Sequence, residues 1–429
     1  MINHDKDQFR AKVAWLPASG RPAPQAFIDA AGAARYRLAE PGETPDIAIV
    51  DLYGADPQSE GATDAVAAAR RAGAHAGVLI AAQAGAAAED RRRCARLGET
   101  VFLRHSVEPL IGAMRERLRL ASLADEAGDR IRSLIADGRT VMFSPSVPKS
   151  ADFSVLIAGK PSPIALAASN AIAAESRRAL SVFSAGQAMR ALDHSKFHGA
   201  VFIPQDENDL LIALARALRR HREHRRLPVI IVSNDEELLD KRAAKDGLDV
   251  MAASRVSDEL FRRLDGATRR AAMAAGMRAF LRSPEGNGGP ALAANARLFA
   301  QHAVRVFRRA DETGGAVSLL ALSLSPKEAA VEDALRTAAR LVRAEDMIAR
   351  LTSSAFIFLL RGVRQTDADR VARRLEGVIA GTQPRPAADH PDVRAAAIER
   401  AHGVELERVI AALVAEIRQR RREAARTTA

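Results

Sequence analysis

The sequence predicts an α/β protein in which two parallel-sheet domains are followed by a third, α+β domain. Short apolar runs alternate with helical segments up to the region near residue 290, and buried strands that alternate with helices indicate a parallel sheet covered on both faces. This order of elements occurs twice over stretches of about the same size, which indicates a duplicated domain. Segments rich in proline, glycine and serine separate the parts.

These separators set the expected domain boundaries. The two clearest linkers are Ser144–Ser150 and Ser283–Pro290. We therefore expect a first domain over 1–121, a helical connector and linker over 122–150, a second domain over 151–265, a connecting helix and linker over 266–290, and a third domain over 291–429.

The apolar runs give the expected elements of the first two domains. In the first, the strands are Lys12–Leu16, Ile47–Val50, Gly77–Ala81 and Val101–Leu103, with a helix near Pro24–Ala31 and a long charged helix over Leu110–Arg139, broken at Gly128 and Gly138. In the second, the strands are Phe153–Ala158, Leu180–Phe183, Ala200–Ile203, Val229–Ser233 and Asp249–Met251, followed by a connecting helix over Asp258–Arg282.

The third domain has a different order of elements. It is expected to run through helix Asn295–Arg309, strand Val317–Leu324, helix Glu332–Arg343, strand Phe356–Leu360, helix Asp367–Ile379, strand Val393–Ile398 and helix Glu405–Arg422.

Composition narrows the class of protein. The chain has 429 residues, of which 48% are hydrophobic and 4% aromatic, so it can bury several cores. Its formal charge of +11 suits an anionic partner, but arginines scattered over helix surfaces are the favoured explanation. A single cysteine, Cys94, excludes an internal disulfide, and Met1–Arg10 has no apolar signal-peptide core. We expect a cytoplasmic protein with no membrane segment.

The third domain contains a pattern around Arg343 and Asp346. Five residues follow this pair, then Thr352–Phe356 (TSSAF) opens an apolar strand. The segment resembles the GGDEF family of diguanylate cyclases, in which R-x-x-D and five residues precede the GGDEF signature. Other segments resemble the same family in order and spacing: Asn295–Phe299, Ser318–Leu324 with Pro326-Lys327, and Asp367–Leu375. The expected fold is therefore nucleotidyl-cyclase-like.

The departures from the family pattern predict a protein without cyclase activity. Phosphoryl transfer in the family depends on Mg²⁺, which prefers carboxylate ligands. By the resemblance, the metal positions fall at Leu322, Leu324 and Ser354 or Ala355, and the lysine of the final helix falls near Ile417. Helix 332–343 also looks about a turn short, so the guanine-pocket residues cannot be assigned. We expect no catalytic residue, no bound metal and no required cofactor.

The R-x-x-D pair matches the family's inhibitory site for cyclic di-GMP. The resemblance implies that Arg343 and Asp346 bind guanine and phosphate, assisted by Arg374 on the following helix. Guanidinium groups pair bidentately with phosphate or guanine, and a carboxylate accepts guanine N–H groups. The alternative is a surface ion pair between Arg343 and Asp346, which contributes under ~1 kcal/mol.

The first two domains resemble flavodoxin-like receiver domains of response regulators. Asp51 follows the strand Ile47–Val50, which the resemblance makes the third strand of a receiver domain and the place of the phosphoacceptor. The accompanying acidic pair, Thr/Ser and Lys are missing: Pro17–Ser19, Ala81-Ala82 and Arg104-His105 stand there instead. Aspartate at a strand end is also a common turn cap. In the second domain the position falls near Ile203-Pro204, which leaves a packing adaptor.

The order receiver, adaptor, GGDEF resembles the PleD-type response regulators, which implies a homodimer and protein partners. The leading hypothesis is an inactive regulator that responds to cyclic di-GMP, and the alternative is a scaffold without nucleotide. An active cyclase requires a different register. Nucleic acid is not expected, because Arg418–Arg422 lacks an accompanying binding motif. His221 and His224, three apart on an expected helix, suit a metal pair but lack a third ligand candidate, which favours a solvated basic helix end.

Overall fold

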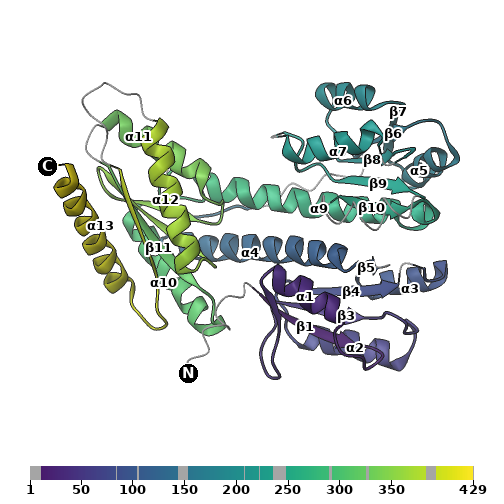
Figure 1. Cartoon of the computed structure of the whole chain (residues 1–429), viewed down its shortest axis with the longest axis horizontal. Coiled ribbons are helices and arrows are strands. Elements are labelled where there is room, and N and C mark those ends of the chain that lie inside the picture. The colour runs from purple at the N-terminus through teal and green to yellow at the C-terminus, as the bar shows by residue number, and fades with distance from the viewer. Residues whose placement is uncertain are drawn as a thin grey trace. The chain divides into compact units, whose positions relative to one another are not determined.

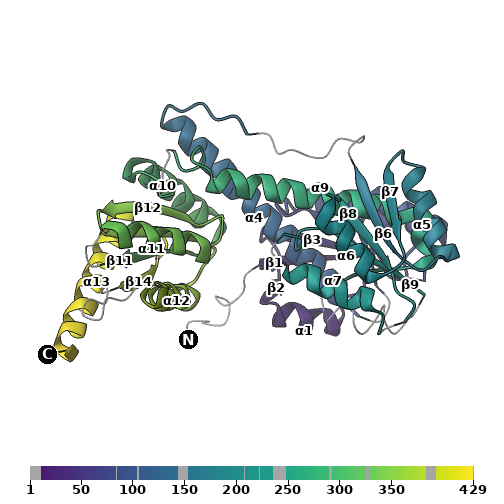
Figure 2. The same ribbon diagram turned by 90° about the horizontal axis from the view of Figure 1, so that it is seen from above.

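The computed structural model describes residues 11–83, 85–103, 106–143, 153–206, 208–221, 223–234, 248–288, 292–324, 328–382 and 393–428. The predicted linker Ser144–Ser150, Arg104-His105 and Pro326-Lys327 lie outside these residues. Contacts divide the chain into two compact units, Met1–Ala121 with Ser146–Ala274 and Ser122–Pro145 with Ala275–Ala429. Figures 1 and 2 label the elements.

The first sheet is parallel, with the strand order β2-β1-β3-β4-β5. Its strands are β1 (Ala11–Pro17), β2 (Tyr36–Leu38), β3 (Ile47–Asp51), β4 (Val78–Gln83) and β5 (Glu99–Leu103); its helices are α1 (Gln25–Ala33), α2 (Glu60–Arg71), α3 (Ala88–Leu97) and the start of α4 (Glu108–Ala136). Alternate residues of β3 enter two separate cores, one with α1 and α4 and one with α2 and α3. This is the doubly wound flavodoxin-like arrangement that the sequence predicts.

The second sheet repeats the arrangement in the order β10-β9-β8-β6-β7. Its strands are β6 (Ser154–Gly159), β7 (Arg178–Val182), β8 (Gly199–Ile203), β9 (Val229–Ser233) and β10 (Asp249–Ala252); its helices are α5 (Pro163–Ala173), α6 (Ala185–His194), α7 (Leu210–Arg220) and α9 (Val256–Arg282). One face packs against α6 and α7, and the other against α5 and α9. The predicted duplication of a parallel-sheet domain is confirmed.

The third sheet is antiparallel and belongs to the second unit, with the order β12-β13-β11-β14. Its elements are α10 (Ala296–Thr313), β11 (Val317–Ser323), α11 (Glu328–Leu341), β12 (Met347–Thr352), β13 (Ala355–Arg361), α12 (Gln365–Thr382), β14 (Arg394–Glu399) and α13 (Leu406–Thr428). Leu320, Leu322, Phe356 and Phe358 pack with α11 and α12 in one core. The predicted α+β domain is confirmed.

Several details differ from the sequence prediction, and strand β12 (Met347–Thr352) is one that was not among the expected elements. The edge strand β2 was not predicted, because three residues give too little periodicity. Helix α4 runs unbroken through Gly128, since a glycine inside a helix weakens it without ending it, whereas Gly138 (φ +79°) does follow its end. Helix α11 spans Glu328–Leu341, so it begins four residues earlier and ends two residues earlier than predicted.

Among the described residues, no helix combines the length and the apolar character needed to cross a membrane.

Candidate functional site

The R-x-x-D segment forms a closed turn between α11 and β12. The backbone N–H of Arg343 donates to Oδ2 of Asp346 at 2.8 Å, and the N–H of Asp346 donates to the carbonyl of Arg343 at 3.3 Å. The second oxygen, Asp346 Oδ1, is buried without a hydrogen-bond partner among the described residues. Burial raises the pKa of the Asp346 carboxyl to about 7, against the opposing effect of the Arg343 amide and charge. Asp346 therefore braces the turn and keeps an unsatisfied oxygen.

Arginines gather at this end of α11. Arg374 of α12 donates to the carbonyl of Leu341 at 2.8 Å, and Arg282, the last residue of α9, donates to the carbonyl of Val342 at 3.5 Å. The last carbonyls of a helix lack intrahelical partners and carry partial negative charge, which attracts cations. Arg343 follows directly and is exposed. The three predicted residues, Arg343, Asp346 and Arg374, thus meet at one corner, and Arg282 joins them there. We call these four residues the arginine corner.

The arginine corner has the chemistry of an anion site. Guanidinium groups from separate elements can bind phosphate bidentately or stack on a purine. Arg282 escaped sequence reasoning because nothing in its local pattern marks it; only its position at the end of a long helix brings it here. The predicted alternative, a surface ion pair, is not what the described residues show: no ion pair joins Arg343 to Asp346, whose carboxylate accepts a backbone N–H instead.

The expected metal positions hold no carboxylate. Leu322 and Leu324 are 0% and 2% exposed and belong to the core beneath α11 and α12. The N–H of Leu324 donates to the carbonyl of Ser354 at 2.9 Å, which ties the end of β11 to the hairpin between β12 and β13. Ile417, at the position of the family's lysine, is buried as well. These positions serve packing.

Two further arginines approach the same hairpin. Arg350 of β12 donates to the carbonyl of Ser353 at 3.2 Å and pairs with Glu332, while Arg421 of α13 donates to the carbonyl of Leu324 at 3.2 Å. Protein cations therefore contact backbone carbonyls where the family resemblance would place a metal.

Asp51 ends β3 in the first sheet and is 6% exposed. Its Oδ1 accepts the backbone N–H of Tyr53 at 2.9 Å, which is the geometry of an Asx turn. Burial raises the pKa of the Asp51 carboxyl, opposed by the Tyr53 bond and by the charge of Arg21. The carboxylate thus closes a turn, as the structural alternative predicts.

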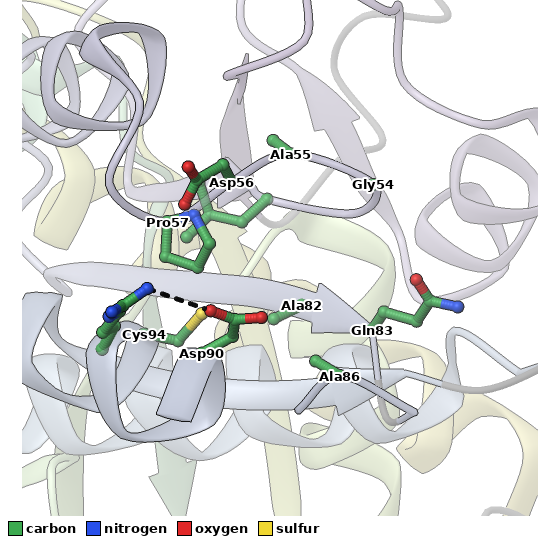
Figure 3. Close-up of a pocket in the computed structure, with 11 residues that line it drawn as sticks. Gly54, Ala55, Asp56, Pro57, Ala82, Gln83, Ala86, Asp90 and Cys94 are labelled. Carbon is green, nitrogen blue, oxygen red and sulfur yellow. Dashed lines mark hydrogen bonds and ion pairs between the residues drawn. The ribbon is translucent and has the colours of Figure 1, made fainter. Parts of the chain in front are cut away.

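A pocket of about 390 Å³ lies just beyond the carboxyl ends of β3 and β4 (Figure 3). It is lined by Leu52, Gly54, Ala55, Asp56, Pro57, Ala82, Gln83, Ala86, Asp90, Arg93 and Cys94. Arg93 pairs with Asp90 at 3.4 Å and with Glu89. Burial raises the pKa of the Cys94 thiol to about 11, so it is no nucleophile at neutral pH. Asp51, the predicted phosphoacceptor, does not line this pocket.

A buried charged cluster lies in the second unit. Oε1 of Glu126 accepts from Arg130 at 2.7 Å and lies 2.9 Å from Nε2 of His302, and the side chains of all three residues are at most 1% exposed. Arg361, at the end of β13, pairs with Asp129 at 2.8 Å and lies 3.6 Å from Glu126. Sequence reasoning missed this cluster because its members are up to 235 residues apart, as Glu126 and Arg361 are. It fixes the 122–145 segment to the third sheet domain.

Known proteins resemble this chain in solved structures and not in sequence-based comparisons. No protein-family model and no curated protein matches the sequence. Among solved structures, the GGDEF domain of DgcB from Caulobacter crescentus in complex with c-di-GMP is 14% identical, covers 30% of this chain and 86% of its own, and has a TM-score of 0.28. Diguanylate cyclase SiaD, in complex with its activator SiaC from Pseudomonas aeruginosa, is 17% identical over 40% of this chain and 72% of its own, with a TM-score of 0.30. A putative two-component response regulator/GGDEF domain protein is 17% identical over 60% of this chain and 97% of its own, with a TM-score of 0.24.

Proposed function

We propose that this chain is a catalytically inactive GGDEF-type signalling protein that binds cyclic di-GMP at the arginine corner and acts through protein partners. The observation that carries the proposal is the meeting of Arg343 and Asp346, from the turn after α11, with Arg374 of α12. Together they offer two guanidinium groups and one carboxyl to a ligand with two phosphates and two guanines.

The buried leucines at 322 and 324 support the inactivity that we propose. A cyclase must neutralise phosphate charge with Mg²⁺, and the positions that would hold the metal are apolar or hydroxyl-bearing. Purified protein should therefore make no cyclic di-GMP from GTP with Mg²⁺ or Mn²⁺. Turnover above a no-enzyme control that disappears when Leu322 and Leu324 become alanine would contradict this part of the proposal.

The binding test is calorimetric titration of cyclic di-GMP into the full chain. Arg343→Ala and Arg374→Ala should each weaken binding about tenfold to a hundredfold, because one charge-assisted contact is worth ~1–3 kcal/mol. The matched control is Arg373→Ala, the exposed neighbour of Arg374 on the same helix, which should bind normally. Arg361→Ala is an unsuitable control, since Arg361 pairs with buried carboxylates and its loss would disturb the fold.

The second candidate is a dimeric scaffold that binds no nucleotide. The bonds of Arg374 and Arg282 to the end of α11 favour it, because they are complete without a ligand. Absence of saturable binding at micromolar cyclic di-GMP would leave only this function. Binding that Arg343→Ala does not weaken would place the ligand elsewhere.

A further inference from the structure

Three side chains with metal-binding atoms converge beyond the end of α7. The helix ends at Arg220, and His221 leaves it with an extended backbone (φ −73°, ψ 129°). The ligand atoms of His221, Glu223 and His224 lie within 4.8 Å of one another, and the two imidazole rings stack with centroids 4.9 Å apart. In a continuous helix, Glu223 would face away from both histidines. Because this segment is a turn, Glu223 lies beside the two histidines instead.

A fourth group with a metal-binding atom lies close to His224, on the neighbouring helix α6. Asp193 of α6 places Oδ1 at 3.9 Å from Nε2 of His224. That nitrogen is buried without a hydrogen-bond partner among the described residues, although the imidazole side chain is 15% exposed. A buried, unsatisfied imidazole nitrogen opposite a carboxylate is an arrangement that a bound cation would complete.

We propose that His221, Glu223 and His224 bind a divalent transition metal, with Zn²⁺ as the best match and Asp193 as the fourth ligand. Imidazole nitrogen and carboxylate oxygen are ligands of tetrahedral zinc, whereas Mg²⁺ and Ca²⁺ prefer oxygen alone. With bonds near 2 Å, tetrahedral ligands stand about 3.3 Å apart, so small rotations of these surface side chains close the site.

The charge balance fits the surroundings. Arg219, Arg220 and Arg225 flank the site and raise the local positive potential, which opposes a cation. The carboxylates of Glu223 and Asp193 balance the charge of a divalent ion, so the ion and its four ligands together carry no net charge. The ion would fasten the end of α7 to the end of α6, two helices that pack on the same sheet face. This site is independent of cyclic di-GMP binding and of the second unit.

The test uses the untagged full chain, dialysed against a chelator and titrated with Zn²⁺ against a chromogenic zinc indicator. Binding of one equivalent at micromolar affinity or tighter is expected, and Co²⁺ in place of Zn²⁺ should give the visible absorption of a tetrahedral ion. His221→Ala and His224→Ala should each weaken Zn²⁺ binding at least about tenfold. Glu223→Gln, a surface change that preserves shape, should weaken it without altering the circular dichroism spectrum.

The matched control is His75→Ala, another partly exposed histidine of the same unit, which pairs with Asp46. It should leave Zn²⁺ affinity unchanged. Asp193→Asn should weaken binding and change the Co²⁺ spectrum, because it removes an anionic ligand. Zinc affinity that needs millimolar metal, or that survives both His224→Ala and Glu223→Gln in folded protein, would overturn the proposal.

Discussion

Asp346 combines two properties that rarely occur in one exposed turn: one carboxylate oxygen accepts a backbone N–H, and the other is buried and unpaired. The resulting pKa of about 7 makes its charge depend on physiological pH. Since guanine N–H groups need an ionised acceptor, a ligand held by Asp346 must bind the deprotonated form. Below pH 7, binding has to release the proton first.

We therefore predict that affinity for cyclic di-GMP falls about tenfold per pH unit below pH ~7. Isothermal titration at several pH values measures this. In Asp346→Asn, affinity should be weaker at pH 8 and nearly independent of pH. A steep fall that persists in Asp346→Asn would assign the proton to another group.

The pKa of Glu126 is shifted in the opposite direction to that of Asp346, because it is lowered. Burial raises its pKa, but the adjacent His302 and Arg130 outweigh burial and lower it to about 2 from 4.5. A carboxyl whose folded-state pKa is depressed stabilises the fold above its unfolded pKa and loses that contribution as pH falls from about 4.5 to about 2. The shift corresponds to ~3 kcal/mol at neutral pH.

Glu126→Gln should thus lower the free energy of unfolding of the second unit by about 3 kcal/mol or more at pH 7, because it leaves the buried Arg130 without its counter-charge. Urea denaturation followed by circular dichroism measures it, and the difference from wild type should shrink toward pH 2. Glu407→Gln, an exposed carboxyl on α13, is the control and should change stability by less than ~0.5 kcal/mol. Equal stability of Glu126→Gln and wild type at pH 7 would show that the cluster is not stabilising.

Some residues could be predicted and others could not, for local reasons. Asp51 could be placed at a strand end because apolar runs mark buried strands directly. The grouping of His221 with Glu223 could not, because helical spacing was assumed past Arg220, where the helix has already ended. Arg282 and Arg361 act through partners distant in sequence, and no local pattern encodes such partners.

At the scale of elements, β11 places the predicted metal positions in the apolar core. Alternate residues of β11 point to opposite faces, and Leu322 lies on the face covered by α11 and α12. A carboxylate there would be enclosed by Leu320, Phe356 and Leu335 rather than by phosphate and metal. Replacing Leu322 alone by aspartate would therefore bury a charge.

Leu322→Asp should consequently destabilise the protein by ~3–5 kcal/mol and restore no cyclase activity. Thermal denaturation and a nucleotide assay by chromatography check the two parts. The control is Leu351→Asp on β12, where the side chain is 37% exposed and the same substitution should be tolerated. Cyclic di-GMP production by Leu322→Asp would mean that the rest of the catalytic machinery is intact.

Long elements followed from sequence more faithfully than their ends. The alternation of apolar runs and helices predicted both parallel sheets, because each strand is connected to the next through a helix. The start of α11 at Glu328 was missed because Glu328–Ala330 is helical by propensity without a clear apolar periodicity. Strand β2 was missed for its shortness.

For the whole molecule, contacts group residues 122–145 with 275–429, although in sequence the segment follows the first parallel-sheet domain. Local patterns mark Leu110–Arg139 as one helix and cannot say which part packs where. The grouping rests on long-range contacts: Arg309 with Asp125 and Asp129, Arg130 with the side chain of Asn287, and Ser133 with His302. The third domain therefore has a core that is completed by a segment from far upstream in the chain.

A fragment of residues 275–429 should then be incomplete by itself. Without 122–145, the fully buried His302 and the nearly buried Arg361 lose Glu126 and Asp129, and Leu134 leaves an apolar gap. We predict that a synthetic peptide of residues 122–145, added in trans, binds the fragment and raises its melting temperature. Anisotropy of the labelled peptide measures binding, and circular dichroism measures melting.

The matched control is the same peptide carrying Glu126→Gln and Asp129→Asn, which keeps its length and apolar face but removes both buried acids. It should bind at least about tenfold more weakly, because the fragment's cations stay uncompensated. If the fragment melts as cooperatively alone as with the peptide, the cluster is dispensable and the segment is only a connector. If both peptides bind equally, apolar packing around Leu134, and not the charged cluster, joins the segment to its unit.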